Sequence, residues 1–257
     1  MQREVARVKP VPSGEWEHEQ SRFTHLPKVP FRFLISGKSA SGKGVLTVNA
    51  VTNFYRDCFE RIYVFAATAN VDNTWQTIAH YAYRHLNQRR REQFMFDEFD
   101  EAALTQIVEN QKIEIARQKN DPDRKKSKGI LVILDDLSDD SAMKRMANGI
   151  LNRIMTTGRH LGISLWANVH SITSMGSLAR RQATAIVVFR IASGTEYKSL
   201  KDQYGKIAGS DESFDKIYEL AVKDPFSFLT ILAASNDPRR MFMLRFEAWL
   251  VPEDLGD

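Results

Sequence analysis

One loop constrains the fold of this chain more than any other feature. Residues 37–44 read GKSASGKG, between the apolar run 31–35 and a stretch of helical pattern that spans residues 43–59. In a G-x-x-x-x-G-K loop between a strand and a helix, glycines let the backbone N–H groups point inward at phosphates, and the helix start adds positive potential. An ordinary Gly-rich turn, the alternative, seldom has both flanking elements. The loop therefore predicts a Walker A site for nucleotide phosphates.

The predicted loop contains one departure from the usual pattern. Its lysine, Lys43, is the expected catalytic contact to the β- and γ-phosphates, but the next residue is Gly44 instead of the Ser or Thr whose hydroxyl holds Mg²⁺. Either another oxygen takes the ion, with Ser41, Thr47 or water as candidates, or catalysis is weakened. The predicted nucleotide contacts are Gly37, Lys38, Ser39, Ala40, Ser41, Gly42, Lys43, Gly44 and Val45.

An acidic pair follows the most apolar run of the chain. Residues 130–134 are five consecutive aliphatic side chains, typical of a strand buried on both faces of a parallel sheet, and Asp135 and Asp136 come directly after them. Two carboxylates at the tip of a buried strand need a cation or hydrogen bonds. If this is a Walker B motif, Asp135 orients Mg²⁺ or its waters and Asp136 polarises the attacking water. The alternative interpretation is that both residues cap the next loop.

The order of the predicted elements indicates an α/β P-loop fold with a mainly parallel sheet flanked by helices, and this arrangement resembles the RecA and FtsK–HerA folds. The long interval between Lys43 and Asp135 leaves room for inserted strands, as in the additional-strand division of these proteins. The expected strands are 31–35, 61–67, 94–96, 130–134, 162–168 and 185–191, and the expected helices are 43–59, 73–86, 101–119, 141–156 and 195–204.

Both ends of the chain differ from this alternating pattern. Residues 226–232 and 241–246 flank Asn236-Asp237-Pro238, a turn signal that predicts an antiparallel hairpin at the sheet edge. Residues 1–30 lack periodicity and contain four prolines, which predicts an extended arm, either disordered or laid across a neighbouring subunit. We therefore expect one ATPase domain over residues 31–257.

Composition excludes several classes of protein. No apolar run approaches the ~20 residues that span a bilayer, and the N-terminus has no secretory pattern. A lone cysteine, Cys58, excludes an internal disulfide framework and fits a reducing compartment. The six histidines show no metal-ligand spacing. A net charge of +4 permits a polyanionic partner without requiring one. An intracellular protein without a membrane partner is the expectation.

Three segments in order, residues 36–43, 134–136 and 157–164, resemble the genome-packaging ATPases of large DNA viruses, the poxvirus-type branch of the FtsK–HerA superfamily. In that family an Arg-His pair, here Arg159-His160, precedes a strand that ends in a polar sensor side chain, often glutamine. The matching position is Asn168 or His170, and Asn168 is the catalytic candidate. A later segment, 177–183, resembles the arginine-bearing stretch of the family.

The resemblance implies a homo-oligomeric ring of five or six subunits that uses ATP and Mg²⁺ to move double-stranded DNA into a capsid. Its partners would be DNA and capsid or vertex proteins, in the virion or at the site of virus assembly in the cytoplasm or nucleus. Such rings insert an arginine from the neighbouring subunit, with Arg180 or Arg181 as first candidates and Arg159 or Arg153 as weaker ones. The alternatives are a helicase or DNA-transfer motor of the same superfamily, and a nucleotide-binding assembly switch weakened by Gly44.

Basic clusters at residues 89–91 and 124–128 either contact DNA phosphates along a pore or are solvated loops.

Overall fold

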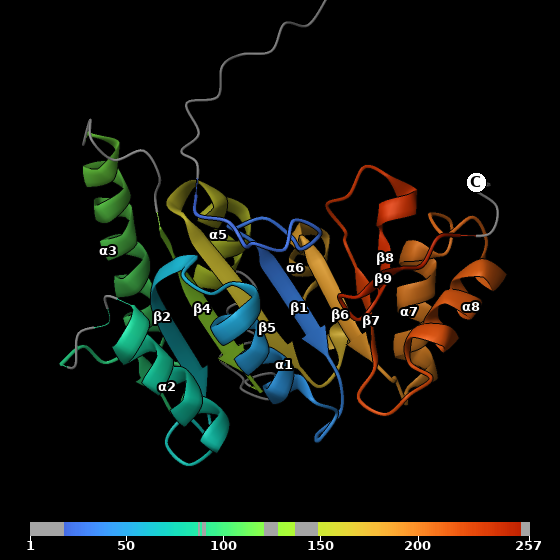
Figure 1. Cartoon of the computed structure of the whole chain (residues 1–257), viewed down its shortest axis with the longest axis horizontal. Coiled ribbons are helices and arrows are strands. Elements are labelled where there is room, and N and C mark those ends of the chain that lie inside the picture. The colour runs from blue at the N-terminus through green and yellow to red at the C-terminus, as the bar shows by residue number, and fades with distance from the viewer. Residues whose placement is uncertain (1–17, 87, 89–90, 121–127, 137–148, 253–257) are drawn as a thin grey trace, which may run out of the picture.

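The computed structural model describes residues 18–86, 88, 91–120, 128–136 and 149–252. Within these ranges the strands form one nine-stranded sheet in the order β3-β2-β4-β5-β1-β6-β7-β8-β9 (Figure 1). The first six strands in sequence pair in parallel and the last three are antiparallel. The strands are β1 Arg32–Ser36, β2 Phe59–Ala66, β3 Met95–Phe96, β4 Gly129–Asp135, β5 Ile163–Val169, β6 Ala185–Phe189, β7 Phe228–Ile231, β8 Phe242–Leu244 and β9 Ala248–Trp249.

Helices cover both faces of this sheet (Figure 1). The α-helices are α1 Lys43–Asn49, α2 Asn73–His85, α3 Glu101–Lys119, α5 Ile150–Thr157, α6 Ser177–Gln182, α7 Gly194–Tyr204 and α8 Asp211–Ala221. Short turns of other helix types are η1 Ala50–Phe54, η2 Gly158–Leu161, η3 Ile172–Ser174 and η4 Pro238–Arg240. In the described ranges, none of the helices combines the length and the apolar character that crossing a bilayer requires.

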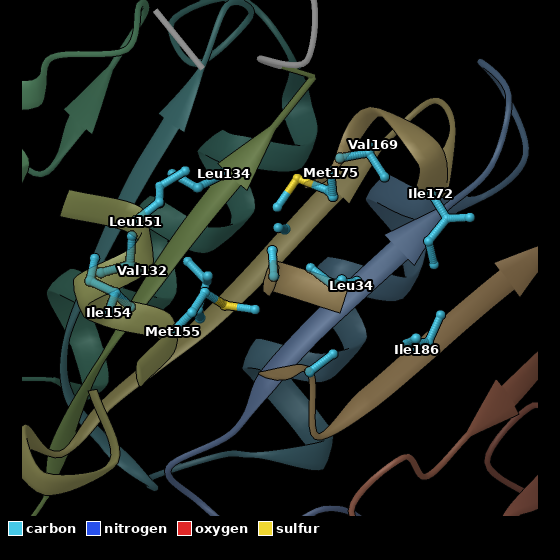
Figure 2. Close-up of a cluster of buried hydrophobic side chains, with 14 of the residues drawn as sticks. Leu34, Val132, Leu134, Leu151, Ile154, Met155, Val169, Ile172, Met175 and Ile186 are labelled. Atoms are coloured by element: carbon cyan, nitrogen blue, oxygen red, sulfur yellow. The ribbon is translucent and has the colours of Figure 1, made fainter. Parts of the chain in front are cut away.

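Successive residues of the central strands enter two separate cores, because side chains alternate between the faces of a strand. On β1, Leu34 packs in one cluster with α3, α5, α6, α7 and α8, and the neighbouring Phe33 packs in the other with α1 and α2. Figure 2 shows the first cluster, where Val132 and Leu134 of β4 face Leu151, Ile154 and Met155 of α5. Burial on both faces explains the uninterrupted aliphatic run of β4.

The strand order places the functional ends together. β5 lies between β1 and β4, so the strand before the phosphate loop and the strand before the acidic pair are next-nearest neighbours. Asn168 of β5 is in register with Ile35 of β1 on one side and with Asp135 of β4 on the other. Because parallel strands present their carboxyl ends at one edge of the sheet, three segments far apart in sequence meet at this edge.

The structure differs from the predicted elements in the end of one helix, in two helices that were not predicted and in the short strand β9. The predicted helix 43–59 ends at residue 54 after a turn of π-helix, because Tyr55 and Cys58 turn into the core and Asp57 adopts a left-handed backbone with φ 63°. Helices α6 and α8 were not predicted. For α8, Ser210 provides an N-cap through its bond from the Ser213 N–H, and Phe214 is fully buried.

Residues near both ends of the described chain pack in the same core, with Leu26 and Val29 from one end and Phe246 from the other. The C-terminal hairpin is confirmed, with β7 and β8 antiparallel around the turn at 235–240. Residues 1–17 of the predicted arm lie outside the described residues. The rest of that segment packs beside η1, where the Tyr55 hydroxyl donates to the Pro27 carbonyl at 2.9 Å and Leu26 and Val29 are buried.

Candidate functional site

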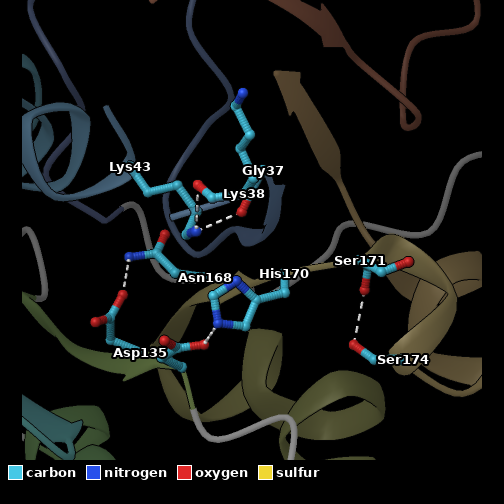
Figure 3. A network of polar contacts seen from close by, with 9 residues as sticks. Gly37, Lys38, Lys43, Asp135, Asn168, His170, Ser171 and Ser174 are labelled. Carbon is cyan, nitrogen blue, oxygen red and sulfur yellow. Dashed lines mark hydrogen bonds and ion pairs between the residues drawn. The ribbon is translucent and has the colours of Figure 1, made fainter. Parts of the chain in front are cut away.

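The phosphate loop connects β1 to α1, and its last residues contact its first ones. Two loop residues have positive backbone φ angles, Ala40 at 58° and Gly42 at 107°, and only the second is a glycine, the residue that adopts such angles freely. The Lys43 ammonium reaches back across the loop and donates to the carbonyl oxygens of Gly37 and Lys38, the latter at 3.2 Å (Figure 3). The lysine side chain therefore lies inside the curve of the loop, where phosphates would be bound.

The acidic pair lies at the tip of β4, near enough to Lys43 for its carboxylates to affect the charge of the ammonium. Burial raises the pKa of the Asp135 carboxyl above its usual value, the hydrogen bond from Asn168 and the charge of Lys43 lower it, and Asp136 and Asp72 raise it further. Burial lowers the pKa of the Lys43 ammonium, and Asp136 and Asp135 partly restore it. Asp136 has a left-handed backbone with φ 56°, unlike the extended strand that ends at Asp135.

A buried polar chain links the phosphate-loop helix to Asp135. The Asn168 amide donates to Asp135 Oδ1 at 2.7 Å (Figure 3) and to the Thr47 hydroxyl at 3.1 Å. The Trp166 indole N–H is shared between Thr47 Oγ1 at 3.0 Å and Asn168 Oδ1 at 3.1 Å. Thr47 itself donates to the Lys43 carbonyl at 2.9 Å. Its hydroxyl is therefore fully used and fully buried, which leaves no lone pair for a metal.

The two sensor candidates contact different acids. Asn168 contacts Asp135 as described, and His170 Nε2 lies 2.5 Å from Asp136 Oδ1 (Figure 3). A protonated imidazole would make this contact an ion pair, and a neutral one a hydrogen bond. Both side chains come from the end of β5, so each acid of β4 has its own polar partner on the neighbouring strand.

Lys43, both acids and His170 line one pocket of about 1110 Å³. Its phosphate end is formed by residues 38–46 with Thr68, Asp72, Thr74, Asp135, Asp136 and His170. Its other end is aromatic, with Phe23, Phe54, Phe226, Phe228 and Phe246 as lining residues and Arg245, Glu247 and His25 as polar ones. A pocket with one charged end and one flat apolar end suits a nucleotide, because the phosphates need N–H groups and cations while the base stacks on rings.

Sequence reasoning missed most of the aromatic end and the Asp72–Thr74 corner. Phe23 packs edge-on against Phe54, which packs edge-on against Phe246, so residues from both chain ends build one wall. His25 Nε2 lies 3.0 Å from the Phe246 carbonyl oxygen. Nothing in local spacing marks these residues, because their contact depends on the C-terminal hairpin folding back over η1.

The four arginine candidates lie outside the lining of this pocket. Arg180 is half-buried and donates to the Met175 carbonyl at 2.9 Å, whereas its neighbour Arg181 is exposed. Arg153 pairs with Glu109 at 2.7 Å. Arg159 lies in η2, just before β5 begins, at the opposite edge of the sheet from the phosphate loop. Of the basic clusters, residues 89–90 and 124–127 lie outside the described residues, and Arg91 is exposed.

The phosphate end fits a divalent cation bound with a nucleotide. Asp72, Asp135 and Asp136 all line it, and Lys43 is the lysine that opposes them at the inner side of the loop. In the described ranges, no group of three or more His, Cys, Asp or Glu side chains is arranged to hold a metal by itself. Mg²⁺ in nucleotide sites usually binds one or two carboxylates and completes its shell with phosphate oxygens and water, so a closed protein cage is not required.

The position of β5 between β1 and β4, with the loop on one and the acids on the other, defines a P-loop NTPase of the additional-strand division. The predicted fold class is thereby confirmed. The particular family follows from the sequence: residues 18–202 match the family described as Poxvirus A32 protein, more than two thirds of the chain, and this protein belongs to that family. It is an ATPase of the viral genome-packaging group, and its resemblance to that group is confirmed.

Solved structures share the fold at low sequence identity. The genome packaging NTPase B204 from Sulfolobus turreted icosahedral virus 2, in complex with AMP, is 13% identical with a TM-score of 0.55, covering 83% of this chain and 96% of its own. The DNA-packaging ATPase B204 from Sulfolobus turreted icosahedral virus is 15% identical with a TM-score of 0.54, covering 84% and 96%.

A third similar structure is the cytoplasmic domain of the Thermomonospora curvata type VII secretion ATPase EccC, 14% identical with a TM-score of 0.50, covering 81% of this chain and 24% of its own. None of the curated protein sequences matches this chain.

Proposed function

We propose that this protein is an ATP-driven translocase that packages double-stranded DNA into a viral capsid, as a homo-oligomeric ring with ATP between subunits. The observation that carries the proposal is the composition of the pocket. The phosphate loop, both acids and His170 line it, but none of the four candidate arginines does. Phosphoryl transfer gains about 10³- to 10⁵-fold in rate from an arginine that stabilises the transferring group. The arginine that does line the pocket, Arg245, lies at its aromatic end and pairs with Glu247 at 2.6 Å, so a neighbouring subunit would supply the arginine at the phosphates.

The chemistry assigned to this chain's own groups follows from their positions. Lys43 and the loop N–H groups would bind and orient the triphosphate. Asp135 would hold Mg²⁺, which neutralises charge on the phosphates when bound. Asp136, with His170 at 2.5 Å, would orient the attacking water and accept its proton. Asn168 would keep Asp135 in place and sense the γ-phosphate. Family membership, and the packaging role named for B204, support DNA as the moved polymer.

Arg181 is the better candidate for the arginine donated in trans. It is exposed, whereas Arg180 is held by the carbonyls of Met175 and Ile172 within its own subunit. Replacing Arg180 would therefore disturb the loop before α6 as well as any contact between subunits. Arg181→Ala removes the exposed side chain alone, and Arg117→Ala, an exposed arginine on α3, is a matched control.

A mixing experiment tests the shared site. Lys43→Ala subunits and Arg181→Ala subunits are each expected to be inactive in DNA-stimulated ATP hydrolysis. In rings formed from an equal mixture, about a quarter of the interfaces combine an intact phosphate loop with an intact neighbouring Arg181, so about a quarter of wild-type activity should return. Mixing with Arg117→Ala should instead leave the activity proportional to the active subunits. Full activity of a dilute monomer would refute the ring.

DNA coupling is tested separately by salt. If basic side chains contact phosphates in the ring, stimulation by double-stranded DNA should fall steeply between 50 and about 200 mM salt, whereas basal hydrolysis should change little. Stimulation that does not depend on salt would argue against phosphate contacts.

A further inference from the structure

The residue after the phosphate-loop lysine is Gly44, and the structure shows what lies against it. The N-terminus of α2 packs on the N-terminus of α1 at this point. A Cβ atom built on Gly44 would lie 3.3 Å from Thr74 Oγ1 and 3.4 Å from Thr74 Cγ2. The threonine side chain thus borders the space that a Ser or Thr at position 44 would use. In the part of the chain that the structure describes, no hydrogen bond of this hydroxyl is recorded.

The other hydroxyls near the loop are less suitably placed. Thr47 is occupied by three hydrogen bonds, as described above. Ser41 Oγ is buried without a hydrogen-bond partner among the described residues, and it faces the β6 side of the loop: a Cβ on Gly37 would meet it at 2.6 Å, next to Phe189. Asp135 lies on β4, two strands from β1 on the other side. Ser41 and Asp135 therefore lie on opposite flanks of the loop.

Thr74 lies on the same flank as the acids. It lines the phosphate end of the pocket together with Asp72 and Asp135. Asp72 caps α2 by accepting the Thr74 N–H at 2.8 Å, which fixes the first turn of the helix and with it the threonine backbone. Asp72 is also close enough to influence the charge of Asp135. The Thr74 hydroxyl, the Asp72 carboxylate and the Lys43 ammonium thus line the same end of the pocket.

We propose that Thr74 supplies the hydroxyl oxygen that Gly44 lacks, so that Mg²⁺ bound with ATP is held by Asp135 and by Thr74 of α2. The assignment rests on the proposed ATP site. It makes the contact between α1 and α2 part of the nucleotide site. The proposal also explains the glycine at position 44, because a β-carbon there would crowd the Thr74 side chain that supplies the hydroxyl.

The test measures Mg²⁺ dependence of nucleotide affinity, which needs no hydrolysis. The dissociation constant of mant-ATP is measured for each variant in Mg²⁺ and in EDTA. Thr74→Val keeps the shape and the methyl contact to position 44 but removes the hydroxyl. We expect its affinity in Mg²⁺ to fall about tenfold, equivalent to ~1.4 kcal/mol, with no change in EDTA. Thr74→Ser should behave as wild type.

Two further variants sharpen the result. Thr77→Val, on the exposed side of α2, is the matched control and should leave both constants unchanged. The exchange Gly44→Ser with Thr74→Ala moves the hydroxyl back to the phosphate loop and removes the atoms that would crowd it. This double variant should recover the Mg²⁺ dependence that Thr74→Ala alone loses. The exchange decides the question even if Thr74→Val folds poorly.

Each alternative gives a distinct pattern. If Ser41→Ala removes the Mg²⁺ dependence and Thr74→Val does not, the oxygen comes from Ser41 and the proposal is overturned. If neither substitution changes it, water completes the shell and the proposal is equally wrong. If the wild-type protein binds mant-ATP in neither buffer, it is the ATP site itself, and with it the proposed function, that fails.

Discussion

Removing the Thr47 hydroxyl should both destabilise the protein and slow the enzyme. Thr47→Val preserves the side-chain shape but leaves Trp166 Nε1 and Asn168 Nδ2 without one acceptor each. Each donor keeps a second partner: Trp166 still reaches Asn168 Oδ1 at 3.1 Å, and Asn168 still reaches Asp135 at 2.7 Å. We therefore expect the cost of one buried group left partly unsatisfied, about 1–3 kcal/mol, and not twice that amount.

Urea unfolding followed by tryptophan fluorescence measures this cost. Thr52→Val is the matched control, because Thr52 also donates to the carbonyl four residues earlier, at 2.8 Å, but no side chain among the described residues donates to it. Its unfolding free energy should stay within about 0.5 kcal/mol of wild type. If Thr47→Val costs no more than Thr52→Val, the polar chain does not contribute as argued.

The same variant separates binding from turnover. Thr47 is not among the residues that line the pocket, so the mant-ATP affinity should change less than about twofold. Asn168 loses one of the two acceptors that fix its amide next to Asp135, and turnover should fall about 3- to 10-fold through poorer positioning. Equal losses in affinity and turnover would show that the substitution disturbs the whole loop.

Three further predictions concern single side chains. Asp136→Asn should retain bound ATP and lower turnover about 10²- to 10⁴-fold in single-turnover assays, and normal hydrolysis would mean that Asp135 and Asp136 have each other's role. Because burial raises the pKa of Asp135, its ionised form costs stability at neutral pH. Asp135→Asn should therefore raise the melting temperature at pH 7 in EDTA, with a gain that shrinks as pH falls through the raised pKa toward 3.8, and a lower melting temperature at pH 7 would contradict this. Phe226 lines the pocket and is 70% exposed, so its ring is free to stack on the base of ATP. Phe226→Ala should therefore weaken ATP binding about 2- to 10-fold and leave tripolyphosphate binding, which involves no base, unchanged.

Sequence alone predicted the strands other than β9, because each of them is an apolar run between turn signals. The aliphatic run before Asp135 is β4, and the run before the phosphate loop is β1. Helix α3 has the predicted bounds, with Asp100 as its cap. Helices whose apolar residues are few, such as α6, gave no periodic signal. The end of α1 was wrong because the buried aromatic Tyr55 extends the helical pattern past the point where the backbone turns.

The candidate site was only partly predictable, for a physical reason. The phosphate loop and the acids are local motifs, and their residues fall at one edge of the sheet. Contacts across elements have no local signal: His170 beside Asp136, Thr47 between two donors of β5, and Thr74 against Gly44 all depend on strand order and helix packing. The site assignments themselves stay predictions until the variants above are measured.

The wall built by Phe23, Phe54 and Phe246 has a consequence for synthesis on the ribosome. Phe246 closes the aromatic end of the pocket, and its carbonyl lies 3.0 Å from His25 Nε2, although the two residues are 221 positions apart. A growing chain carries its phosphate loop outside the ribosomal tunnel long before residue 246 emerges. Until then it lacks the aromatic residues that we propose to stack on the base. Nascent chains should therefore bind ATP more weakly than the folded domain does.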